Sequence, residues 1–234
     1  MLNAEILNAL KGYVQNMKSD VTLVLQMGAH EKRKEQANFL QAIANVSDKI
    51  SFVERDEPEK LRSPVSFLLE SDGVDAGIRF SGIPGGHEFN SFVLALLQVS
   101  GTPVKLDENL KSIIENIDED LRFEAFISLS CHNCPDVVQT LNQFAVLNPR
   151  ISCEMIDGGL FPELIEQRDI QGVPSVYLND EVFANGKVDP SVLVTRMMER
   201  APKNPQSPPF KEAPLQGVLV MGGGPAGVSA AIYE

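Results

Sequence analysis

Two cysteines separated by two residues, Cys131 and Cys134, are the residues of this sequence best suited to chemistry. With His132 and Asn133 between them, they follow an apolar segment typical of a strand and precede a segment with helical periodicity. A thiolate is favoured at the amino end of a helix, where unpaired backbone N–H groups and the helix dipole stabilise an anion. The second cysteine, one turn further on, can then resolve a mixed disulfide. The motif predicts thiol–disulfide exchange with Cys131 as nucleophile and Cys134 as resolving thiol.

The same spacing also occurs in zinc sites, in purely structural disulfides and by accident. A zinc site needs a second pair of ligands, and Cys153, His30 and His87 form no pair with ligand spacing. A structural disulfide is disfavoured in a reducing compartment, and accidental spacing is disfavoured by the strand before the motif and the helix after it. Cys153 lies in the middle of an apolar strand and is expected to be a small buried hydrophobe.

The elements that must position the cysteines follow an order that occurs twice. In the first half, a helix at the N-terminus precedes strands at 21–27, 50–55, 64–70 and 77–82 and helices at 31–45 and 87–99. In the second half, we expect strands at 122–130, 150–157, 174–179 and 181–185 and helices at 106–120, 135–147, 160–169 and 189–200. Strand–helix–strand units that end in a hairpin predict an α/β fold with mixed sheets flanked by helices.

The two halves align directly in sequence. Residues 39–56 match residues 140–157 at a constant shift, and Pro64 and Pro174 each precede a strand. We therefore expect two tandem units, at 1–102 and 103–200. The first unit contains no cysteine, so it is expected to be inactive in disulfide exchange and to support the second.

A third region begins near Ala201. Residues 201–215 are rich in proline and predict an extended linker. Residues 216–234 form an apolar strand that runs into Gly222, Gly224 and Gly227, the phosphate-binding fingerprint of a dinucleotide-binding domain. The second strand and the acidic residue of that unit are absent, so we expect the start of an FAD- or NAD(P)-binding domain that holds no cofactor in this chain.

Composition narrows the classes of partner. A formal net charge of −12 disfavours a surface for nucleic acid. No apolar run approaches the roughly 20 residues that span a bilayer, and the N-terminus lacks the features of a signal peptide. We expect a protein of the cytoplasm that binds no membrane.

Two further residues complete the candidate site. Pro174 follows Val173 about forty residues after Cys131, an arrangement that resembles thioredoxins and glutaredoxins, in which this proline is cis and faces the dithiol. Thioredoxins also keep a buried acid six residues before the first cysteine, where this sequence has Ala125. Glu88 is a candidate for the missing proton acceptor. Alternatively, Glu88 is simply an acid favoured by the dipole at the start of a helix.

The combination of a cysteine-free half with the segments SLSCHNCPDVVQ, GVPSV and VMGGGPAG resembles the N-terminal region of the flavoprotein component of alkyl hydroperoxide reductase. The resemblance covers essentially the whole chain. It implies two fused thioredoxin-like folds that carry electrons from an FAD- and NADH-binding module to a two-cysteine peroxiredoxin, within a homodimer and with 201–215 as a swinging linker. It also implies that Glu88 reaches the dithiol from the inactive half, and that Pro174 is the cis proline.

Two different functions are still open at this point. One is a free-standing, general protein disulfide reductase built from tandem thioredoxin-like units, and the second is a redox-inert scaffold.

Overall fold

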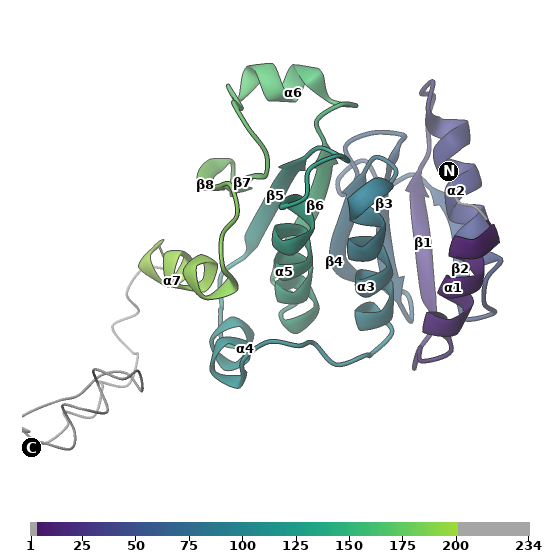
Figure 1. Cartoon of the computed structure of the whole chain (residues 1–234), viewed down its shortest axis with the longest axis horizontal. Helices are drawn as coiled ribbons and strands as arrows, with labels where there is room; N and C mark the ends of the chain where they lie inside the picture. The colour runs from purple at the N-terminus through teal and green to yellow at the C-terminus, as the bar shows by residue number, and fades with distance from the viewer. Residues whose placement is uncertain (1–3, 201–234) are drawn as a thin grey trace, which may run out of the picture. The chain divides into compact units, whose positions relative to one another are not determined.

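An eight-stranded mixed sheet runs through residues 4–200, the part of the chain that the computed structural model describes (Figure 1). Its strands are β1 (Val21–Gln26), β2 (Ile50–Arg55), β3 (Ser66–Ser71), β4 (Val74–Ser81), β5 (Leu121–Ile127), β6 (Ile151–Asp157), β7 (Ser175–Leu178) and β8 (Glu181–Asn185). The predicted linker at 201–215 and the predicted nucleotide-binding start at 216–234, with Gly222, Gly224 and Gly227, lie outside the described residues.

The helices alternate with these strands along the chain. They are α1 (Ala4–Val14), α2 (Arg33–Ala44), the short 3-10 helix η1 (Gly86–Glu88), α3 (Phe89–Val99), α4 (Glu108–Glu115), α5 (Cys134–Leu147), α6 (Pro162–Gln167) and α7 (Pro190–Arg200). Within residues 4–200, no helix has the length and apolar character needed to cross a membrane.

The two halves have the same strand order, which confirms the repeat. The first half is ordered β2-β1-β3-β4 and the second β6-β5-β7-β8. In each half the first two strands are parallel, the third pairs antiparallel with the first, and the last two form a hairpin. This is the mixed sheet expected of two tandem thioredoxin-like folds.

The halves join through a parallel pair between β4 and β6, in which Ile78 is opposite Cys153 and Ser81 is opposite Ile156. The last strand of the first half therefore continues directly into the sheet of the second, and residues up to Arg200 form one compact unit. The sequence repeat predicts two units but does not predict which strands meet. The boundary at 102/103 stays a prediction.

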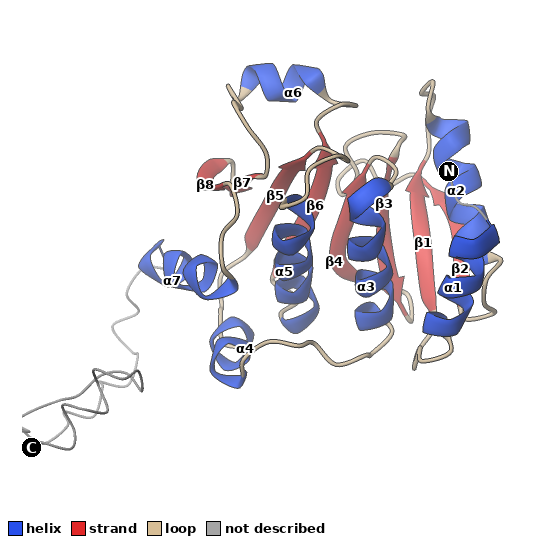
Figure 2. Ribbon diagram, viewed as in Figure 1, coloured by secondary structure: helices blue, strands red, loops and turns tan. Residues whose placement is uncertain are grey.

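The main core lies between the sheet and the helix pair α3 and α5, which lie side by side on one face (Figure 2). Apolar side chains from both halves, including Phe80, Phe92, Phe123 and Phe144, are fully buried in this one cluster. The active half and the inactive half thus share a core, and α5 is held on one side by α3.

On the opposite face of the sheet, Arg62 from the first half reaches two carboxylates of the second. Its guanidinium donates to Glu154 at 2.6 Å from Nη2 and also to Glu124. The side chains of Glu124 and Glu154 are 2% and 11% exposed, so they depend on this arginine and on Arg168 for their counter-charge.

Some predicted elements differ in length from the observed ones. The helix expected at 106–120 ends at Glu115, because residues 116–120 turn towards β5 instead of continuing the apolar stripe. The helix expected to begin at His87 begins as η1 at Gly86 and becomes α-helical only at Phe89. The strand expected at 64–70 begins two residues later, at Ser66.

Candidate active site

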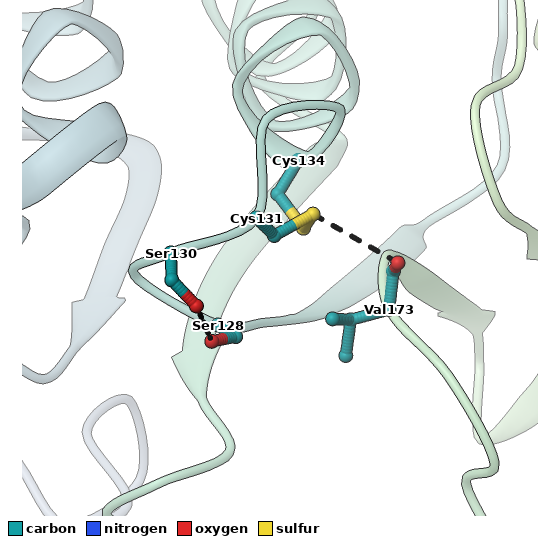
Figure 3. The surroundings of a disulfide bond; sticks show 5 residues. All are labelled: Ser128, Ser130, Cys131, Cys134 and Val173. Atoms are coloured by element: carbon teal, nitrogen blue, oxygen red, sulfur yellow. Dashed lines mark hydrogen bonds between the residues drawn. A yellow bond between two sulfur atoms is a disulfide. The ribbon is translucent and has the colours of Figure 1, made fainter.

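Cys131 and Cys134 form a disulfide at the point where β5 leads into α5 (Figure 3). Strand β5 ends at Ile127, residues 128–133 cross the end of the sheet, and α5 begins with Cys134 itself. The sulfur-bearing residues differ in access: Cys134 is fully buried, whereas Cys131 is partly exposed. A partner's sulfur can reach only the exposed member of the pair.

The amino end of α5 offers backbone donors to a thiolate. Asn133 is the N-cap residue, but its side chain makes no capping hydrogen bond, and Pro135 in the first turn has no N–H to satisfy. The loop before the helix is held by a hydrogen bond from the Cys131 N–H to the Ser128 carbonyl oxygen, at 2.9 Å. These features place Cys131 where the positive end of the helix dipole favours an anion.

The segment before β7 faces the disulfide. The Val173–Pro174 peptide bond is cis, and the Val173 carbonyl oxygen lies 3.8 Å from the Cys131 Sγ, as the dashed line in Figure 3 shows. A sulfur in a disulfide carries no proton, so this distance is a contact that becomes a hydrogen bond only when Cys131 is reduced. The bond before Pro64, the equivalent proline of the first half, is trans.

Glu88 is buried beside the amino end of α5. His87 contacts His132 and Ser91 accepts a hydrogen bond from Gln139 at 3.3 Å, so Glu88 lies between two contacts that join the halves. Neither carboxylate oxygen has a hydrogen-bond partner at ordinary distance. Burial therefore dominates and raises the pKa of Glu88 to about 7, although the nearby Ser91 hydroxyl partly opposes the shift.

The sheet behind the dithiol carries no carboxyl at the position where thioredoxins keep one. Ala125 is fully buried there, and Cys153 on the neighbouring strand is buried as well. Burial raises the pKa of the Cys153 thiol, and the charges of Glu154 and Glu88 add to this effect. The expectation that Cys153 is a buried, unreactive thiol agrees with this environment.

One contact at the site involves a residue that the sequence suggested only as a possible zinc ligand. The His87 ring from the first half lies 4.2 Å from the His132 ring, centroid to centroid, and both side chains are exposed. The signal for this contact is tertiary, because forty-five positions separate the two residues in the sequence.

In the first half, the positions of the two cysteines are occupied by His30 and Arg33. The Arg33 guanidinium donates to Glu54 at 3.0 Å and to the Gln26 carbonyl oxygen at 3.2 Å, which ties the helix start to two strand ends. Across residues 4–200, no three His, Cys, Asp or Glu side chains are grouped so that they could hold a metal ion.

Comparison with known proteins adds independent information. A protein-family model described as a thioredoxin domain matches residues 121–198, the half that holds the disulfide. The alkyl hydroperoxide reductase AhpF from Pseudomonas aeruginosa is 43% identical over all of this chain, and an NADH dehydrogenase from Bacillus subtilis is 42% identical over the same extent. The chain spans 44% of the length of each of these relatives.

A solved structure matches the fold of both halves together. It is the N-terminal NTD_N/C domain of alkylhydroperoxide reductase AhpF from Enterococcus faecalis, with a TM-score of 0.77 and 31% sequence identity. The match covers 83% of this chain and 99% of that structure.

Proposed function

Because this chain belongs to the AhpF family of alkyl hydroperoxide reductases, as its N-terminal portion, we propose that it relays electrons from an NADH-dependent flavin module to a two-cysteine peroxiredoxin. The observation that carries the proposal is the Cys131–Cys134 disulfide at the start of α5, with only Cys131 open to a partner. The predicted roles of the two cysteines follow from this difference in access.

The first step is attack by the Cys131 thiolate on one sulfur of the oxidised peroxiredoxin. The partner's disulfide bond breaks, a bond forms between Cys131 and the partner, and the leaving thiolate takes up a proton. The amino end of α5 stabilises the attacking thiolate, and the Val173 carbonyl, 3.8 Å from Sγ, marks where the partner's extended backbone can pair.

In the second step, Cys134 attacks Cys131 and releases the partner in its dithiol form. Cys134 is buried, so its proton must leave through a neighbouring group. Glu88 fits this role, since it is buried beside α5 and burial raises its pKa to about 7, where a carboxylate can accept a thiol proton near neutral pH. The two electrons from the dithiol end on the partner, and the Cys131–Cys134 disulfide is restored.

The third step returns the dithiol. A dithiol of the flavin- and NADH-binding module attacks the Cys131–Cys134 disulfide and is itself oxidised. The chemistry of FAD and NADH belongs to that module. The residues of this chain that resemble its beginning, Gly222, Gly224 and Gly227, lie outside the described residues.

The proposal is tested by trapping the mixed disulfide. The Cys134→Ser variant, reduced and mixed with oxidised peroxiredoxin, is expected to accumulate a covalent adduct that thiol reductant removes, because the resolving sulfur is missing. Cys131→Ser is the matched control and should form none. An adduct through Cys134, or equal adduct yields with peroxiredoxin and with an unrelated disulfide protein such as insulin, would contradict the dedicated relay.

A further inference from the structure

The first half contributes directly to the surface around the reactive sulfur. The Gly86 backbone packs against the active-site loop so closely that an added Cβ would lie 2.6 Å from the Leu129 carbonyl oxygen. Gly86 also has a φ of +55°, a conformation that favours glycine. The backbone of η1 is therefore fixed against the loop that carries Cys131.

This close contact brings His87 to the rim of the site. Its ring lies 4.2 Å from the ring of His132, the residue that follows Cys131, at an interplanar angle of 44°. Both rings are exposed, so neither is required to fill the core. Exposed aromatic pairs at the centre of a contact surface are typical anchors for a protein partner.

The sheet order places the two walls of the site on opposite sides of Cys131. Strand β7, which follows Val173 and Pro174, pairs with one edge of β5. The strand that leads to η1, β4, lies on the other side of β5, beyond β6. A polypeptide that pairs with the Val173 segment while presenting its disulfide to Cys131 is thus exposed, on its far side, to His87 and His132.

We propose that His87, from the cysteine-free half, is a specificity-determining residue: with His132 it forms a platform that contacts a polypeptide disulfide partner and not a small disulfide. This inference rests on the proposed function and assigns the inactive half a part in recognition. The sulfur chemistry is unchanged, because His87 contacts His132 and not the disulfide.

The test compares two oxidants of the reduced chain: oxidised two-cysteine peroxiredoxin and dipyridyl disulfide, a small molecule that reaches Cys131 directly. His87→Ala is expected to lower the second-order rate constant for peroxiredoxin about tenfold, the loss typical of an aromatic contact residue, and to leave the rate with dipyridyl disulfide unchanged. His87→Phe keeps a ring and should retain most of the rate. His30→Ala, at the matching region of the first half, is the control and should change neither rate.

Each remaining outcome decides the matter. Equal rates for His87→Ala and the wild type with peroxiredoxin would overturn the inference while leaving the proposed function intact. An equal loss with both oxidants, or a shifted pH profile with dipyridyl disulfide, would mean that His87 acts on the sulfur chemistry or through Glu88, and would also overturn it. Failure of the wild-type chain to reduce peroxiredoxin would reject the proposed function itself, and the inference with it.

Discussion

At the scale of single residues, the site differs from thioredoxins in where its buried acid comes from. Ala125 leaves the sheet behind the dithiol without a carboxyl, and Glu88 enters from the other half. An acid buried without hydrogen-bond partners destabilises the fold once it ionises. Such a cost is tolerated where the group has a task, which supports a role for Glu88 in proton transfer.

Replacing Glu88 by Gln should remove a specific part of the dependence of stability on pH. The pKa of Glu88 is about 7 in the folded chain and near 4.5 in the unfolded one, so the folded state binds the proton more tightly. The stabilisation by this proton is complete below pH 4.5 and is lost as the pH rises to 7. Urea unfolding at pH 4.5 and at about pH 8 should show the variant gaining about 3 kcal/mol relative to the wild type over this range. Parallel curves for the two proteins would show that Glu88 is ionised at ordinary pH.

The three cysteines should react in two classes. In the reduced native protein, dipyridyl disulfide is expected to oxidise Cys131 and Cys134 within seconds, because Cys131 is accessible and Cys134 then closes the disulfide. Cys153 is fully buried with a raised thiol pKa, so it should react only after denaturation. The measurement is a titration before and after adding guanidinium, with Cys153→Ala as control. Rapid reaction of Cys153 in the native state would show that β6 opens locally.

At the scale of elements, η1 connects the halves at the active site, and its position depends on one glycine. Gly86→Ala places a Cβ against the Leu129 carbonyl oxygen in a conformation that disfavours side chains, so the free energy of unfolding should fall by roughly 1–3 kcal/mol. Gly85→Ala is the matched control: its Cβ would meet nothing closer than 3.9 Å, and the expected change is within about 0.5 kcal/mol. Similar losses for both variants in thermal or urea unfolding would show that the close approach at Gly86 is not tight.

Most elements could be predicted from periodicity, because apolar stripes at helical spacing and runs of β-branched residues are local signals. The CxxC motif was recognisable for the same reason, since a strand and a helix flank it. The β4–β6 pair, the burial of Glu88 and the contact between His87 and His132 were not, because each depends on how distant segments meet. The repeat indicated two similar units, but only the three-dimensional arrangement shows that they share one sheet.

At the scale of the whole molecule, Arg62 joins the halves on the face opposite α3 and α5. It is the shared counter-charge of Glu124 and Glu154, both largely buried on adjacent strands of the second half. Together with the β4–β6 pair, this contact predicts that residues up to 200 unfold as one cooperative unit in spite of the sequence repeat.

Replacing Arg62 by Met should therefore weaken both halves together. Two buried carboxylates lose a partner, so the free energy of unfolding is expected to fall by about 3–5 kcal/mol. Arg150→Met, which breaks an ion pair with Asp120 at the surface, should cost no more than about 1 kcal/mol. Native-state hydrogen exchange read on peptides of β4 and β6 measures the two halves separately, and Arg62→Met should reduce their protection equally, because the continuous sheet opens as one. A loss confined to β6, with β4 still protected, would show that the inactive half is a separate folding unit that merely contacts the active one.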